Sequence, residues 1–93
     1  MSNRFEQLKN KYRATFSQKL LDLKEAKENE KFDEIHGLLH KLAGSSGSYG
    51  FTELSLLCRE GMNCIDEGGN LNQSKQLEQN LEAIFVYLQA KAL

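Results

Sequence analysis

Apolar residues recur along this chain at intervals of three and four positions, the spacing that places side chains on one face of an α-helix. The pattern predicts four amphipathic helices at about 3–28, 31–48, 52–67 and 72–91, and no proline interrupts them. Because the expected connections are too short for long crossovers, we expect an all-α, antiparallel up-down-up-down four-helix bundle. A three-helix arrangement, in which the first segment breaks or fuses with the second, is the alternative. The inner face of the first helix is expected to consist of Phe5, Leu8, Tyr12, Phe16, Leu20 and Leu23.

The composition is that of one small globular domain spanning residues 1–93, with 40% hydrophobic and 27% charged residues. A formal net charge of -1 supplies no basic field to attract nucleic acid or an anionic membrane, so neither partner is expected. The first residues lack the apolar core of a signal peptide, and no stretch has the length needed to span a bilayer.

The two cysteines, Cys58 and Cys64, are six positions apart. On one helix this spacing turns them roughly 240° from each other, so they cannot form a disulfide with each other. We interpret them as reduced thiols, which indicates a reducing compartment and predicts a cytoplasmic protein.

The second predicted helix contains an unusual concentration of glycine, since four of the chain's seven glycines lie within residues 36–50. A glycine inside a helix costs about 0.5–1 kcal/mol relative to alanine, so Gly37, Gly44 and Gly47 together would cost ~2–3 kcal/mol. One interpretation is that residues 44–50 form a flexible Gly/Ser linker. Against it, Leu42 and Tyr49 continue the apolar stripe of the same helix. A functional reason for the small residues is therefore favoured.

Angular positions on this helix place His40 outside the core. With Ile35 at the centre of the stripe, His40 lies at roughly 140°, and the small residues three, four and seven positions later, Ala43, Gly44 and Gly47, lie at roughly 80°, 180° and 120°. An accessible imidazole can act as a nucleophile or as a ligand. His36, four residues earlier, could share a metal with it, but further ligands are missing and no metal site is expected. A histidine without any role would leave the glycines unexplained.

At these residues the sequence resembles the signature of histidine-containing phosphotransfer (HPt) domains. The resemblance lies in the run His-Lys-Leu-Ala-Gly-Ser-Ser-Gly-Ser-Tyr-Gly at 40–50, followed by Leu54 and Cys58, and it extends to the length and helix order of the whole chain. It implies that His40 accepts a phosphoryl group from a receiver-domain phosphoaspartate and passes it to another receiver aspartate in a multistep phosphorelay. It also implies a phosphocarrier without kinase activity of its own, hence not an enzyme.

The resemblance further implies a monomer that binds receiver domains of response regulators, of a hybrid sensor histidine kinase and of a downstream regulator. No cofactor of its own is expected, because Mg²⁺ belongs to the receiver. Gly44 and Gly47 would allow the receiver to approach closely, and His36 and Ala43 would border the docking surface. The family often has lysine where this chain has Ala43, and Lys41 is either its replacement or a solvated surface residue. The alternative function is a phosphate-independent interaction adaptor on an HPt-like bundle, and a small structural bundle with an incidental histidine is a third.

Overall fold

The computed structural model describes residues 3–67 and 75–93, and all regular structure within them is helical. The helices are α1 (Asn3–Arg13), α2 (Phe16–Glu28), α3 (Phe32–Ser48), α4 (Thr52–Asp66) and α5 (Lys75–Lys91). The predicted helices at 31–48 and 52–67 are confirmed to within one residue at each end. The last helix ends at the predicted position, whereas its predicted start at 72 lies outside the described residues. None of the helices in the described ranges is long and apolar enough to cross a membrane.

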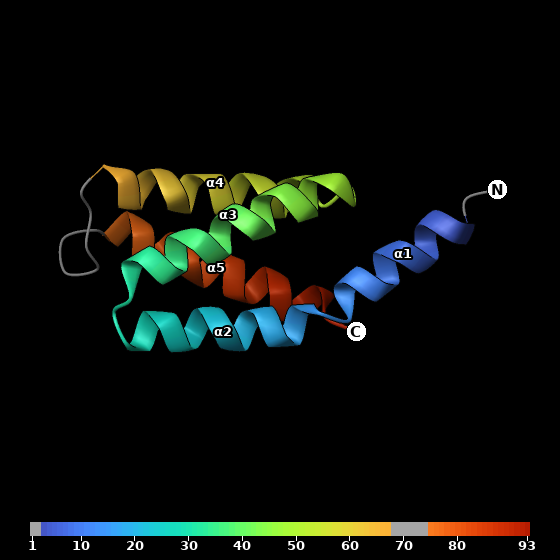
Figure 1. The fold of residues 1–93 in the computed structure, drawn as a ribbon, viewed down its shortest axis with the longest axis horizontal. Helices are drawn as coiled ribbons and strands as arrows, with labels where there is room; N and C mark the ends of the chain where they lie inside the picture. The colour runs from blue at the N-terminus through green and yellow to red at the C-terminus, as the bar shows by residue number, and fades with distance from the viewer. Residues whose placement is uncertain (1–2, 68–74) are drawn as a thin grey trace.

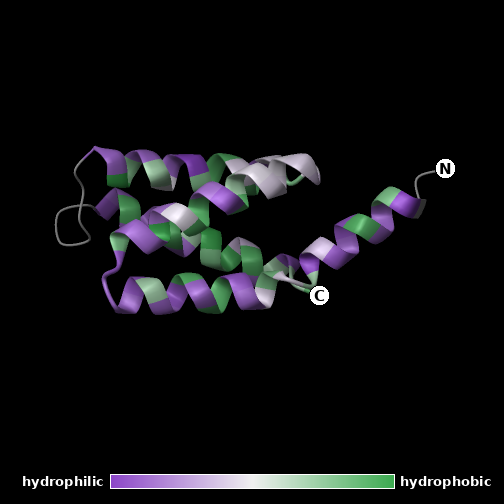
Figure 2. Cartoon of the chain, viewed as in Figure 1, coloured by the Kyte–Doolittle hydropathy of each residue, from purple (hydrophilic) through white to green (hydrophobic). Residues whose placement is uncertain are grey.

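Helices α2 to α5 form a helical bundle, in which α3 packs against α2 and α4, and α5 packs against α2 and α4. In Figure 1 the end of α2, the start of α3, the end of α4 and the start of α5 lie at the same end of the molecule. Hydrophobic residues line the sides of these helices that face one another (Figure 2). The fully buried side chains of this core include Phe16, Leu23, Ile35, Leu39, Leu54, Leu77, Leu81, Ile84 and Leu88.

The expectation of one continuous helix over 3–28 is wrong, because the chain breaks at Ala14 and Thr15. The backbone N–H of Thr15 donates to the Tyr12 carbonyl at 2.9 Å, and the Thr15 hydroxyl donates to the same oxygen at 2.6 Å. Such local bonds of a threonine compete with the regular helical ladder. As a result α1 projects from the bundle (Figure 1), and Phe5 and Leu8, predicted to be inside, are 45% and 43% exposed.

Two tight turns hold α3 in position between its neighbours. After α2, Glu30 adopts φ 54°, and the N–H groups of Glu30 and Lys31 donate to the carbonyls of Lys27 and Ala26. After α3, Gly50 adopts φ 85°, and the same pattern of two hydrogen bonds recurs with the N–H groups of Gly50 and its successor. This is the Schellman arrangement, in which a left-handed residue satisfies the last carbonyls of a helix. Only glycine adopts that conformation without a steric cost, which explains Gly50.

Candidate functional site

His40 lies on the solvent face of α3, near the middle of the helix. The rotation of α3 about its axis is set by Ile35, Leu39 and Ser46, which are fully buried against the other helices. His40 is turned away from that stripe and is exposed, as the angular positions predict. The rigid core on one side of α3 therefore presents this imidazole to solvent on the other.

The surface beside His40 is bare at Gly44 and Gly37. A Cβ atom built at either position would meet nothing within 4 Å, so no neighbouring helix requires glycine there. Gly47 differs, because a Cβ at that position would lie 3.4 Å from the Ser55 hydroxyl oxygen of α4. The small size of Gly44 and Gly37 therefore serves only the exterior, while Gly47 also lies where α3 meets α4.

Ala43 does not border an exposed surface, which corrects the expectation. It is 4% exposed and belongs to the core, and its carbonyl accepts a hydrogen bond from the Ser55 hydroxyl at 2.9 Å. The reason is the close packing of α4 against this flank of α3, which widens the buried arc beyond the stripe that the periodicity indicates. In this chain, the position at which the family often has lysine is therefore buried by α4.

His36 lies one turn before His40 and is engaged by α4. Its Nε2 atom lies 3.0 Å from Asp66 Oδ1, and its side chain is one-third exposed. A partly buried pair of this kind carries a full ion-pair interaction only when the imidazole is protonated. His36 is therefore tied to the α3–α4 contact at the edge of the exposed face, and its free surface is smaller than that of His40.

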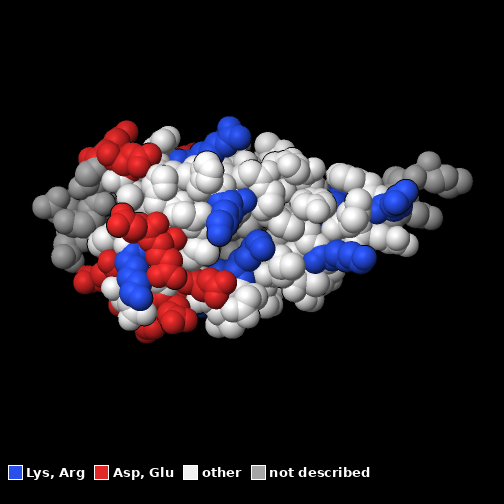
Figure 3. Space-filling model, viewed as in Figure 1, with Lys and Arg blue, Asp and Glu red and all other residues white. Residues whose placement is uncertain are grey.

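A groove between α2 and α3 brings together two lysines that are 22 positions apart in sequence. Lys19 of α2 and Lys41 of α3 both line this groove of about 250 Å³, together with Asp22 of α2. Lys19 also lies over the ring of Tyr12, with Nζ 5.5 Å from the ring centroid. In Figure 3 basic side chains occupy the middle of the molecule and the part that contains α1, while acidic side chains gather at the end where α2 meets α3. Sequence reasoning did not find Lys19, because no local signal places it beside α3.

The serines of the glycine-rich run are bonded within the fold. Ser45 and Ser48 donate from their hydroxyls to the carbonyls of Lys41 and Gly44, each one turn earlier in α3. The Ser45 hydroxyl is also hydrogen-bonded to the Tyr12 hydroxyl. Burial raises the pKa of Tyr12, so this phenol stays protonated at neutral pH. The hydrogen bond between Ser45 and Tyr12 joins the end of α3 to α1, whereas the Ser48 hydroxyl is bonded within α3.

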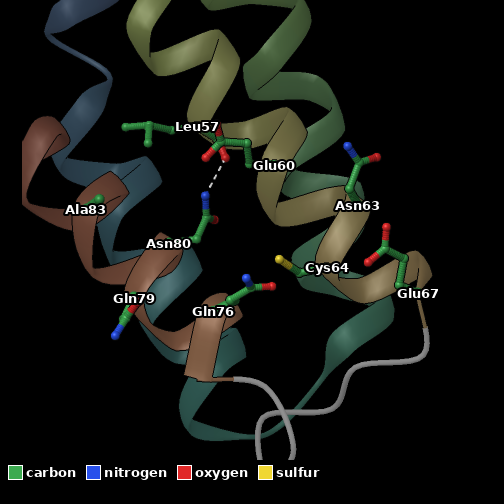
Figure 4. Close-up of a pocket in the computed structure, with 9 residues that line it drawn as sticks. All are labelled: Leu57, Glu60, Asn63, Cys64, Glu67, Gln76, Gln79, Asn80 and Ala83. Atoms are coloured by element: carbon green, nitrogen blue, oxygen red, sulfur yellow. Dashed lines mark hydrogen bonds between the residues drawn. The ribbon is translucent and has the colours of Figure 1, made fainter.

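Other hollows of the surface lie away from His40. A pocket of about 480 Å³ between α4 and α5 is bordered by Cys64, Glu60 and Glu67, and within it the Asn80 amide donates to the Leu57 carbonyl at 2.8 Å (Figure 4). Neither histidine lines this pocket. No group of three or more His, Cys, Asp or Glu side chains in the described ranges could hold a metal ion.

Comparison with known proteins places this geometry in a family. No curated protein and no solved structure matches the chain. The family model of the Hpt domain matches residues 7–91, which include the whole bundle and the exposed histidine on α3. The chain belongs to the Hpt domain family.

Proposed function

We propose that this protein is a histidine phosphotransfer protein that relays a phosphoryl group between receiver-domain aspartates through His40. Hpt domains as a family act in phosphorelays as phosphocarriers rather than kinases, and they interact with receiver domains. The observation that carries the assignment to His40 is an exposed imidazole on a rigid helix beside Gly44, where nothing fills the space above the backbone. His36, the other histidine, is engaged by Asp66 and is a poorer candidate.

The transfer requires little chemistry from this chain. A ring nitrogen of His40 attacks the phosphorus atom of the receiver's phosphoaspartate, so that a P–N bond forms while the P–O bond to the aspartate carboxylate breaks. Delivery to a second receiver reverses these roles, because an aspartate oxygen attacks and the imidazole leaves. The Mg²⁺ that spreads the developing negative charge belongs to the receiver, and this protein needs no cofactor of its own.

We assign the positive charge that accompanies the phosphoryl group to Lys41 with Lys19. The two side chains line one groove at the flank of the helix that carries His40, where their two positive charges exceed the one negative charge of Asp22. Because Ala43 is covered by the packing of α4, the flank facing α2 is the side of α3 on which lysines are available. Removing either charge is expected to slow transfer from a receiver while leaving the helical fold intact.

The proposal also covers the arrangement of the helices, the partners and the cellular location. We propose that α2–α5 run antiparallel in an up-down-up-down bundle that serves as a rigid support for α3. The expected partners are the receiver domains of a hybrid sensor kinase and of a downstream regulator. The proposed location is the cytoplasm, which the two free cysteines support, since free thiols are typical of a reducing compartment.

Incubation with a phosphorylated receiver domain and Mg²⁺ tests the proposal. The wild-type protein is expected to acquire a label that is lost in acid and retained in alkali, and His40→Gln is expected to abolish it without changing the circular dichroism spectrum or the melting temperature. His36→Gln is the matched control, because it changes the other histidine of the same helix and should retain labelling. A wild-type protein that binds receivers but is never labelled would instead favour the adaptor function. Labelling that persists in His40→Gln would contradict the assignment.

The role of the lysine charges is tested by comparing Lys41→Ala and Lys19→Ala with Lys31→Ala. Lys31 is an exposed lysine at the start of α3 that does not line the groove. The first two are expected to lower the initial rate of transfer, and the third to leave it unchanged. Equal rates in all three variants would show that the groove lysines do not assist the reaction.

A further inference from the structure

Helix α1 carries an apolar stripe that begins in the core and continues into solvent. At its inner end, Tyr12 stacks on Tyr49 with ring centroids 4.6 Å apart and is buried. At its outer end, Phe5 and Leu8 continue the same face but are almost half exposed. Figure 2 shows hydrophobic positions along the projecting part of α1. A helix of 11 residues is marginal by itself in water, so a stripe of this kind indicates a surface that covers it.

The charge of α1 indicates which kind of surface could cover its apolar stripe. Four basic residues against one glutamate give α1 a net charge of +3, although the whole chain has -1. At helical spacing, Lys9 lies on one side of the apolar stripe and Arg4 and Lys11 lie on the other. The surface that accepts α1 should therefore be apolar along its floor and acidic along its rims.

Such a surface exists on the same molecule, between α4 and α5. A shallow groove of about 540 Å³ has Leu57, Tyr87 and the 59% exposed Val86 on its floor, and Glu53 and Glu82 beside them. No lysine or arginine lines this groove. It continues into the pocket of Figure 4, with which it shares Leu57 and Ala83, and whose rim carries two more glutamates.

The base of α1 lies beside one end of the groove, which runs along α5 from Gln79 to Ala90. The Arg13 side chain at the end of α1 donates from Nε to the Lys91 carbonyl of α5 at 2.7 Å. Burial raises the pKa of Tyr87, which lines the groove; the negative charge of Glu53 adds to this rise, and the positive charge of Arg13 opposes it. However, α1 is held on the other side of this junction, where Lys9 lies 5.4 Å from the ring centroid of Phe51. In Figure 1, α1 extends away from α4 and α5, the two helices that line the groove of the same molecule.

We propose that two copies of this protein associate by exchanging α1, so that each α1 lies in the α4–α5 groove of the other copy. Phe5 and Leu8 pack against Val86 and Tyr87 of the second copy, and the flanking lysines face the glutamates of its groove. We place both contacts about one two-fold axis, with the base of α1 beside the end of the groove, so that the assembly closes as a dimer. An 11-residue helix is about 16 Å long, so this is a small interface, and weak, micromolar association is expected.

This association goes beyond the proposed phosphotransfer and replaces the monomer that the family resemblance implies. Its contacts lie on α1, α4 and α5, whereas His40 lies on the outer face of α3. The dimer therefore leaves the histidine accessible. Whether the protein forms this dimer is independent of whether His40 carries phosphate.

Sedimentation equilibrium across protein concentrations from about 1 to 500 µM tests the proposal. The wild-type protein is expected to shift from monomer to dimer, and more weakly at 500 mM than at 50 mM salt, because exposed charge pairs are screened. Leu8→Ser and Phe5→Ser should each abolish the dimer. Leu21→Ser is the matched control, because Leu21 is an exposed leucine on α2, outside the proposed contact. A wild-type protein that is monomeric throughout, or a dimer equally sensitive to Leu21→Ser, would overturn the proposal.

A charge-reversal experiment tests the pairing of α1 with the groove more directly. One variant carries Lys9→Glu and Lys11→Glu in α1, and the other carries Glu53→Lys and Glu82→Lys in the groove. Each alone should be monomeric, because like charges face each other in both contacts. Their mixture should form a heterodimer, since both of its contacts then join opposite charges. If the mixture stays monomeric while Leu8→Ser weakens binding to a receiver domain, the stripe on α1 belongs to a receiver contact and the dimer is refuted.

Discussion

Replacing Gly44 by leucine is expected to stabilise the protein and, at the same time, to impair it as a phosphocarrier. Gly44 lies inside α3, where glycine costs about 0.5–1 kcal/mol relative to good helix formers. A Cβ there meets nothing within 4 Å, so the larger side chain clashes with no part of this fold. The free energy of unfolding should therefore rise by about 0.5–1 kcal/mol, which corresponds to an increase in melting temperature of about 2–8 °C for a domain of this size.

The same side chain fills the bare surface one turn from His40. If a receiver packs on that surface, overpacking of the contact costs about 1–3 kcal/mol, which is about a 5- to 150-fold loss in the affinity of the complex. The assay compares melting curves with initial rates of labelling from a phosphorylated receiver at sub-saturating concentration. Gly37→Leu is the comparison variant, because Gly37 is equally open and also one turn from His40 but precedes it along α3, whereas the proposed docking glycines follow it.

The expected result is that both variants melt at higher temperature and only Gly44→Leu loses transfer. A Gly44→Leu protein that transfers at the wild-type rate would refute the docking role of this surface. A Gly44→Leu protein that unfolds more readily than the wild type would show that the glycine is needed inside the fold.

Three further outcomes follow from the packing. Burial raises the pKa of the Cys58 thiol to about 12 from its ordinary value of 9.0. The unfolded chain therefore loses this proton first as the pH rises. Between about pH 9 and 12, the free energy of unfolding should fall by up to ~1.4 kcal/mol per pH unit because of this group. In urea unfolding at a series of pH values, the slope of the free energy of unfolding against pH should be smaller for Cys58→Ala by the contribution of one proton. Gly61→Ala should destabilise by about 1–3 kcal/mol in thermal melts, because its Cβ would lie 2.5 Å from Asn80 Oδ1 and 2.8 Å from Leu39 Cδ1, whereas alanine at an open helical glycine should stabilise. Glu30→Gly should stabilise by about 1 kcal/mol in urea unfolding, since φ 54° strains any residue with a Cβ.

The amino-acid sequence by itself determined the class of fold, the extents of α3 and α4, and the outward direction of His40. Each of these follows from the spacing of apolar residues within one segment, since a helix of known period with a marked apolar stripe has only one way to face a core. The residues around His40 also sufficed to identify the Hpt family, because most of the motif lies within a single helix and the turn that follows it, with Leu54 and Cys58 on the next helix.

Only the tertiary structure decided what covers the flanks of each helix. The stripe of α3 does not specify how closely α4 approaches, so Ala43 was expected outside the core and is inside it. Lys19 joins Lys41 through the packing of α2 on α3, which no spacing along the chain records. The apolar period also runs unbroken through Thr15, where two hydrogen bonds to one carbonyl end α1 and direct it away from the bundle. Periodicity describes the direction of a side chain about its own helix axis, whereas burial depends on whether a second helix is present on that side.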